Sequence, residues 1–337
     1  MQQRILRTDE RKGNTMIHAR PGVVAAALAT SLVLASGGEK AAAQQDAVRL
    51  RMRFDAGHTV RMRMTMDQQI SQTILGQPQN LEQTTEMVYA VAVEEVDAEG
   101  TAVVEWTYDE LRFEQTSPMG QLLYDSSDPN AAVSPMLAGY AALVGASFWA
   151  RMTSTGQVLD VWGVEPILQK MLDEMALPPG PQSEQLQEQL RNQFGDQAMR
   201  EMLTRMMAVY PTEPVVVGDS WTSRNAITSG FPITIDATYT LRERRGGVAF
   251  VDVAATVEST PGAGGMQMGG TTLEFDLSGE QSGTLEIDEI SGWVVRGTVA
   301  QDFSGQVQVD AGQAAAQSMT WPISIKGTMN LELVNEG

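Results

Sequence analysis

The sequence predicts a mainly β fold with a helical insertion. We expect a long, curved antiparallel sheet, or more than one, in a half-barrel or sandwich-like arrangement. The first observation behind this is that apolar and polar residues alternate over long segments. A period of two is the pattern of a strand with one buried face. The second is that helical spacing of apolar residues is concentrated in the middle of the chain, at residues 164–210. We therefore expect this helical segment to pack on the apolar face of the sheet.

The alternation is clearest in residues 48–74. Apolar residues occupy every second position from Val48 to Phe54 and again from Val60 to Met66, and arginines or threonine lie between them. A turn at residues 55–58, which contains a glycine, separates the two runs. A glycine-containing turn between two alternating runs indicates a β-hairpin. We expect residues 48–74 to form the opening hairpin of the sheet.

Similar alternation on both sides of the helical segment predicts ten to twelve antiparallel strands. A break in the alternation near Glu110 predicts a β-bulge, and the composition of residues 118–129 and 260–270 predicts loops. After the opening hairpin, the expected strands span residues 81–96, 101–113, 147–153, 157–162, 231–242, 248–257, 272–287, 292–309 and 319–334.

Helices are expected in two places. Ser134 and Pro135 predict the start of a short helix that ends near Val144, because serine caps helices and proline fits the first turn. The longer helical region carries apolar stripes at residues 164–175, 186–194 and 199–206, with a proline-rich break between the first two.

Residues 1–43 resemble a secretory signal peptide. Five basic residues precede an apolar run from Val23 to Ala35, and the small residues Ala41, Ala42 and Ala43 match a cleavage site. The apolar run is too short for an ordinary transmembrane helix. We expect cleavage near Ala43, an exported protein in the periplasm or outside the cell, and one β-rich domain over residues 44–337. This pattern is compatible with a translation start at Met1 and with one at Met16.

The composition restricts partners and chemistry. Lys and Arg total 23 against 42 Asp and Glu, and removal of residues 1–43 leaves 17 against 39, a net charge of −22. Such a surface repels nucleic acid and anionic membranes. The chain contains no cysteine, which rules out disulfides and thiolate chemistry. His58, at the predicted turn, is the one histidine outside the signal segment, so histidine-dependent triads and zinc sites are not expected.

Acidic and thioether side chains leave some chemistry open. Carboxylate pairs are frequent, but no pattern places two of them in one cleft, as a glycosidase-type site needs. Residues 124–130 contain several oxygen ligands without the spacing of a known calcium loop. The chain has 20 methionines, and thioethers can bind copper(I). Because Met62, Met64 and Met66 alternate with polar residues, core packing is the simpler explanation.

The assembled pattern resembles an uncharacterised family of exported bacterial β-rich proteins, a domain of unknown function. The resemblance covers most of the chain after the signal. It is carried by the turn and methionine run Gly57–Met66, the turn Val96–Gly100, Phe148 followed by the turn Thr153–Val158, and the turn Val217–Trp221. Thr153 stands where the family pattern has serine. The resemblance implies a β-rich exported protein and no catalytic residues. The architecture is also similar to the half-barrels of lipoprotein carriers, at the level of the fold.

We expect a non-enzymatic β protein without cofactor or metal, which binds or carries a hydrophobic ligand such as a lipid in a methionine-rich interior. A filled core without a ligand is the alternative within this hypothesis. An envelope scaffold or interaction protein is a second hypothesis, and a carboxylate-dependent hydrolase a third. Protein partners are not predicted. The residues expected to line the apolar pocket are Met62, Met64, Met66, Met171, Leu172, Met199, Met202, Leu203 and Met206.

Overall fold

The computed structural model describes residues 46–334, apart from residues 119, 129–132, 135–136, 175–179, 181–183, 185–186, 189, 192–193, 228–232, 261–265, 269–270 and 311–318. The predicted signal peptide, residues 1–43, lies outside the described residues. All structure below belongs to the compact unit Gln45–Gly337.

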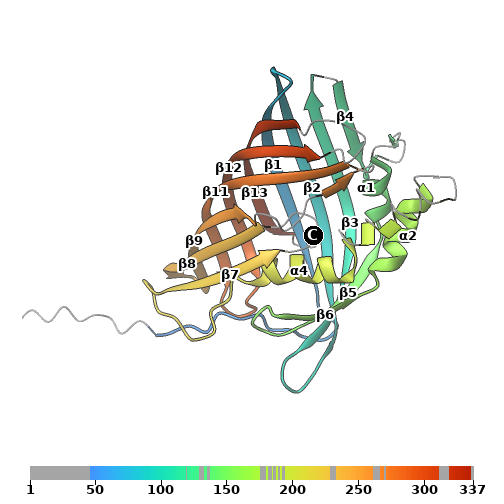
Figure 1. The fold of residues 1–337 in the computed structure, drawn as a ribbon. Helices are drawn as coiled ribbons and strands as arrows, with labels where there is room; N and C mark the ends of the chain where they lie inside the picture. The colour runs from blue at the N-terminus through green and yellow to red at the C-terminus, as the bar shows by residue number, and fades with distance from the viewer. Residues whose placement is uncertain are drawn as a thin grey trace, which may run out of the picture. The chain divides into compact units, whose positions relative to one another are not determined.

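One antiparallel sheet of 13 strands makes up most of this unit (Figure 1). Eleven strands follow one another in the order β6-β5-β3-β2-β1-β13-β12-β11-β9-β8-β7, while β4 pairs with β3 and β10 with β11. The strands are β1 (Thr59–Ile74), β2 (Gln77–Val96), β3 (Ala102–Ser117), β4 (Gly120–Asp125), β5 (Ser147–Met152), β6 (Val158–Trp162), β7 (Ser220–Ile227), β8 (Ile233–Arg245), β9 (Val248–Ser259), β10 (Met266–Met268), β11 (Thr271–Asp288), β12 (Val294–Asp310) and β13 (Met319–Val334). The predicted fold class is confirmed.

The two ends of the chain meet in the middle of the sheet. β1 pairs with β2 on one side and with the last strand, β13, on the other, over twelve residue pairs from Arg61–Val334 to Gln72–Ile323. The β strands before and after the helical region are therefore continuous through the β1–β13 pair, and the edge strands are β6 and β7.

The predicted opening hairpin is wrong in its first strand. Residues 48–54 are extended, and their alternation is real, because Leu50, Met52 and Phe54 are buried and the arginines between them are exposed. This segment does not pair with β1. Instead Val48 bridges to Val215, and the backbone N–H of Met52 donates to the Ser154 carbonyl. Alternation reports which side chains are buried, and it does not identify the hydrogen-bonding partner.

Two predicted loops also contain strands. Residues 120–125 form β4 because Tyr124 pairs with Phe113 of β3 and is buried against it, with Leu122 packed nearby. Residues 266–268 form the short strand β10 on β11. By contrast, the bulge expected near Glu110 is confirmed, since the β2–β3 register shifts between Val88 and Tyr89, opposite residues 108–110.

Three helices are described: α1 (Ala138–Leu143), α2 (Val164–Glu174) and α4 (Asp196–Met207). α1 packs on α2, and α4 contacts both edge strands, β6 and β7 (Figure 1). The contact with β7 includes a hydrogen bond from the Trp221 indole to the Val209 carbonyl, 2.9 Å, just after α4 ends. The helix α4 therefore joins the two edges of the open sheet. The predicted packing of the helical region on the apolar face is also present, because Ile167 of α2 and Leu203 of α4 belong to the same buried cluster as Met62 of β1.

The main core shows that the sheet bends round on itself. Tyr89 of β2 and Tyr239 of β8 belong to one buried cluster, although five strands separate β2 from β8 in the sheet. Glycines on the concave side permit the bend. A Cβ atom at Gly305 would lie 1.8 Å from the Asp276 carbonyl oxygen, and one at Gly283 would lie 2.0 Å from the Thr298 carbonyl oxygen. Close approach of a neighbouring backbone is a reason for glycine within a strand.

Candidate binding face

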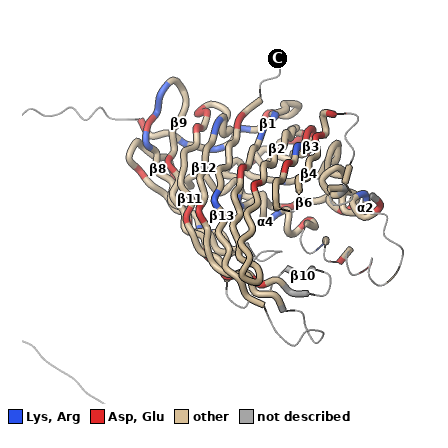
Figure 2. Tube along the Cα trace, turned by 90° about the horizontal axis from the view of Figure 1, so that it is seen from above, with Lys and Arg blue, Asp and Glu red and all other residues tan. Residues whose placement is uncertain are grey.

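We call the concave side of the sheet, which carries Met62, Val91 and Val251, the inner face. Its composition follows from the strand register, because side chains alternate between faces. Along the described strands β1, β2, β9, β11, β12 and β13, the inner-face positions hold no Asp, Glu, Lys or Arg. The same holds for β8 from Ile233 to Leu241. By the same register, the charged residues of these strands lie on the opposite, outer face or at strand ends. Figure 2 shows where the charged residues fall along the Cα trace.

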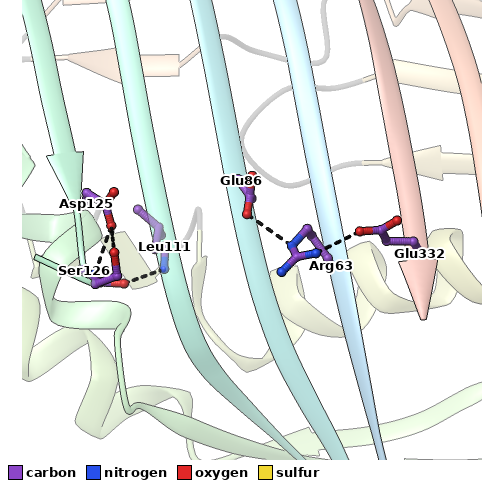
Figure 3. A network of polar contacts seen from close by, with 7 residues as sticks. Arg63, Glu86, Leu111, Asp125, Ser126 and Glu332 are labelled. Atoms are coloured by element: carbon purple, nitrogen blue, oxygen red, sulfur yellow. Dashed lines mark hydrogen bonds and ion pairs between the residues drawn. The ribbon is translucent and has the colours of Figure 1, made fainter. Parts of the chain in front are cut away.

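Ion pairs connect neighbouring strands across the outer face. Arg63 of β1 lies between Glu86 of β2 and Glu332 of β13, with N–O distances of 3.1 and 2.9 Å (Figure 3). The hydrogen bond to Glu332 is the main cause that raises the pKa of Arg63. Lys326 and Asp302 form a similar pair between β13 and β12, at 2.8 Å. The sheet therefore has one charged and one uncharged face.

The inner face carries three apolar clusters, one of which joins Leu111, Phe113 and Tyr124 of β3 and β4 to Leu137 just before α1. The other two are a main cluster and a second cluster. The main cluster is shared between strands, helices and the extended segment 48–54, so that this part of the face is a packed core. The members of the second cluster among the described residues come from the strands β1, β11, β12 and β13. Its three buried members are Leu277, Val307 and Ile323, and its half-buried members are Ile70, Leu273, Phe275, Trp321 and Ile325.

A row of glutamines separates the main cluster from the second cluster. Residues that pair directly across β3, β2, β1, β13, β12 and β11 form this row, which we call the glutamine band: Gln115, Gln83, Gln68, Gly327, Gln301 and Gln281. All five glutamines are half-buried. Gln301 Nε2 lies 3.1 Å, and Gln68 Cγ 3.2 Å, from the position that a Cβ atom would take at Gly327. The side chains of Gln68 and Gln301 therefore both lie against Gly327.

The predicted pocket-lining residues fall into three groups. Met62 and Leu203 are buried in the main cluster, and Met64, Met171, Met199 and Met202 pack against it. Met66 and Leu172 are half-buried without belonging to that cluster, and Met206 is 36% exposed. Sequence reasoning thus identified residues that pack together. It missed the second cluster and the glutamine band, whose members become neighbours only through the register of separate strands.

The main cluster contains buried phenols, and α4, which packs on this cluster, carries a half-buried cation. Burial raises the pKa of Tyr89 and Tyr210, and it raises the pKa of Tyr108 to about 12. The Tyr210 hydroxyl donates to the Gly292 carbonyl at 2.7 Å. Arg205 of α4 is half-buried, and burial lowers the pKa of its guanidinium.

A small polar hollow lies on the outer side of β2, β3 and β4, with a volume of about 220 Å³. Its lining includes Glu86, Glu110, Arg112 and Asp125. Two hydrogen bonds from Ser127 lower the pKa of Asp125, and the Ser126 hydroxyl accepts from the Leu111 N–H at 2.9 Å (Figure 3). Within the described ranges, no group of three or more His, Cys, Asp or Glu side chains is arranged to hold a metal ion. In the oxygen-rich segment predicted at residues 124–130, Tyr124 and Asp125 end β4 and Ser126 and Ser127 form a turn, whereas residues 129 and 130 lie outside the described residues.

Sequence comparison supplies the family. A model of a family of unknown function (DUF6263) matches residues 99–294, more than half of the chain. The chain belongs to this family. The DUF6263 match runs from the β2–β3 turn through the helices to the first residue of β12. It confirms the resemblance to an uncharacterised family that the sequence motifs indicated. No curated protein matches the chain.

Solved structures resemble this DUF6263 protein only in part. A chain from a study of lipid–protein interactions in lipovitellin aligns with 84% of it at 10% identity and a TM-score of 0.44. The aligned region is 26% of the lipovitellin chain, about a quarter of its length. Pseudomonas aeruginosa OccK2 (OpdF), solved in complex with glucuronate, aligns over 86% of this chain and 100% of its own at 4% identity and a TM-score of 0.22. Scores this low carry no information about function.

Within the part of the chain that the structure describes, no helix has the length and apolarity needed to cross a membrane.

Proposed function

We propose that this protein is an exported, non-enzymatic binder of one apolar small molecule, a lipid, which it holds on the inner face of the sheet. The observation that carries the proposal is the second apolar cluster. It continues the inner face beyond the packed core, and its described members come from four neighbouring strands of the sheet.

The form of this surface favours a small ligand. Monomeric soluble proteins rarely leave extended apolar surface without a use, and ligand sites are concave and mostly apolar. Five members of the cluster, among them Ile70, Trp321 and Ile325, are half-buried rather than fully buried. The bend of the sheet places them on a concave side, while the charged outer face interacts with water.

Charge supports the same conclusion. A protein with a net charge of −19 keeps every acidic side chain off the inner-face positions of its central strands. Burial of an unpaired charge is expensive, so an apolar ligand gains most from a surface without charges. The export part of the proposal is supported by the signal-like pattern of residues 1–43.

Native mass spectrometry of the protein, purified without detergent from the cells that produce it, tests this function. We expect a population heavier than the chain by the mass of one lipid, which disappears after extraction with organic solvent. A mass that shows only the bare chain, a second copy or a protein partner would contradict the proposal.

A pair of variants locates the bound molecule. Phe303 lies on the inner face of β12 and pairs with Ile325, whereas Ser304 is exposed on the outer face. Phe303→Glu places a charge beside the second cluster and should abolish the added mass, while Ser304→Glu should retain it. Circular dichroism and urea unfolding of both variants separate loss of ligand from loss of fold. Equal lipid occupancy in two folded variants would remove the inner face as the site.

A further inference from the structure

The glutamine band is the feature of the inner face that apolar binding does not explain. Five carboxamides cross the sheet in one row, in a region whose neighbours on both sides are mostly apolar. Next to the band, Met66 and Met329 lie on one side and Ile70 and Ile325 on the other. Because an unsatisfied amide in apolar surroundings costs free energy, such a row requires hydrogen-bonding partners.

Little of the band is satisfied by the protein itself. In the described part of the chain, Gln83 makes one long hydrogen bond, 3.5 Å to the Thr85 hydroxyl. The side chains of Gln68, Gln281 and Gln301 make none with another described residue, and their amide atoms are not fully buried. Gln72, one row further along β1, differs, since it accepts from the Trp321 indole at 3.2 Å. The band therefore offers free donors and acceptors to the concave space.

The chemistry of the band specifies the group that would bind there. A carboxamide offers both N–H donors and a carbonyl acceptor, and it carries no charge. It matches ester carbonyls and hydroxyls. A phosphate or carboxylate would be favoured by arginine or lysine, and the central inner-face positions contain neither.

The distances along the strands suit an acyl chain beside such a group. From Gln68 to Ile74, at the far end of β1, six residues of strand span ~20 Å at roughly 3.3 Å each. The second cluster occupies this stretch, with Ile70 on β1 and Ile325 and Trp321 on β13. An extended lipid chain would lie along these side chains if its polar end were held at the band.

We infer that the glutamine band selects an uncharged lipid that bears ester or hydroxyl groups, of the acylglycerol class, and holds its polar part while the acyl chain covers the second cluster. This inference rests on the proposed function and adds to it the class of ligand. The band then acts as the specificity element of the binding face, and the apolar cluster supplies most of the affinity.

Competition binding tests the inference with three probe lipids. Dioleoylglycerol is uncharged with two esters and a hydroxyl, dioleoylphosphatidylglycerol is anionic, and squalene has no polar group. Each is presented in phosphatidylcholine vesicles to the delipidated protein loaded with a fluorescent apolar probe, and displacement of the probe is measured. For the wild-type protein, dioleoylglycerol should displace the probe at a concentration about tenfold lower than squalene, the effect of one or two net hydrogen bonds.

Leucine variants provide matched controls on the same strands. Gln68→Leu and Gln301→Leu remove amides from the band with little change in size, and should bring dioleoylglycerol and squalene to similar displacing concentrations. Gln69 and Gln306 are exposed on the outer face, so Gln69→Leu and Gln306→Leu should keep the wild-type preference. Unchanged binding of squalene in the band variants shows that they are folded.

Each contrary result has a separate meaning. If none of the three lipids displaces the probe from the wild-type protein, the proposed function fails. If dioleoylglycerol and squalene compete equally in the wild type, the face binds lipid and the inference about the band is wrong. A preference for dioleoylphosphatidylglycerol that Arg205→Gln removes would also overturn the inference, because the head group would then be recognised at α4.

Discussion

Replacing Gly305 with valine should strongly destabilise the sheet, because no space exists for a side chain on that side of β12. A Cβ atom there would lie 1.8 Å from the Asp276 carbonyl oxygen and 2.9 Å from the Leu277 Cα. Real Cβ contacts are essentially never shorter than 3.0 Å, so the β11 backbone would have to move by about 1.2 Å or more. That movement would break the local pairing between Leu277 and Gly305.

The expected cost can be stated. Overpacking in cores costs about 1–3 kcal/mol, and here the clashing atoms belong to the backbone, which cannot adopt another rotamer. We therefore expect a loss of about 3 kcal/mol, a large part of the ~5–15 kcal/mol stability of a typical domain. With a urea m-value of ~3 kcal/mol/M, the midpoint of unfolding would fall by ~1 M.

Ser304→Val is the matched control for this variant. Ser304 is exposed on the outer face of the same strand, where valine suits a β conformation. Its free energy of unfolding should stay within ~0.5 kcal/mol of the wild type, as is usual for surface substitutions, so that its urea midpoint moves by no more than ~0.2 M. If Gly305→Val unfolds at the urea concentration of the wild type, the close approach of β11 and β12, and with it our explanation of the bend, is wrong.

Three further variants test buried phenols and a shielded ion pair. Tyr210→Phe should cost about 1–2 kcal/mol in urea unfolding, since it leaves the buried Gly292 carbonyl without its donor. Stability should fall as the pH rises from about 10 to 12, because the phenol of Tyr108 ionises at about pH 10 in the unfolded chain and at about 12 in the folded one. Tyr108→Phe should reduce that fall. Arg244→Gln should cost about 2 kcal/mol, because the paired contacts of its guanidinium with Glu289, 2.7 and 2.8 Å, are largely shielded from water.

Two further variants serve as controls. Arg242→Gln breaks an exposed pair with Asp252, so it should cost much less than Arg244→Gln. Tyr124→Phe removes another buried phenol, and its loss of stability in urea unfolding is compared with that of Tyr210→Phe. Equal losses for Arg242→Gln and Arg244→Gln, or a stability that is constant from pH 10 to 12, would contradict the respective predictions.

The sequence predicts individual strands well because burial imposes a period of two. β11, β12 and β13 begin and end within two residues of the expected ranges. The same principle misassigned residues 48–54, since an extended segment inside a core shows the same alternation as a strand in a sheet. The strand β4 was missed because turn residues surround it, although Leu122 and Tyr124 lie on one face.

The candidate site was only partly predictable. The burial of apolar residues such as Met62 and Leu203 can be predicted from the local sequence pattern, and the structure brings both into the main cluster. The glutamine band depends on pairings such as Gln281 with Gln301 and Gln68 with Gln83, and on β1 pairing with β13 over a separation of more than 250 residues. No local pattern reports such a register, so the row is visible only in the folded chain.

Cysteine protection tests the central claim, that a lipid covers the inner face and leaves the outer face free. The natural chain has no cysteine, so single substitutions report on one position each. In the lipid-loaded protein, Ile70→Cys and Phe303→Cys should react with a water-soluble thiol reagent at least about tenfold more slowly than after delipidation. Ser71→Cys and Ser304→Cys, on the outer face next to them, should react at the same rate in both states. Protection of all four positions, or of none, would contradict a lipid bound to the inner face.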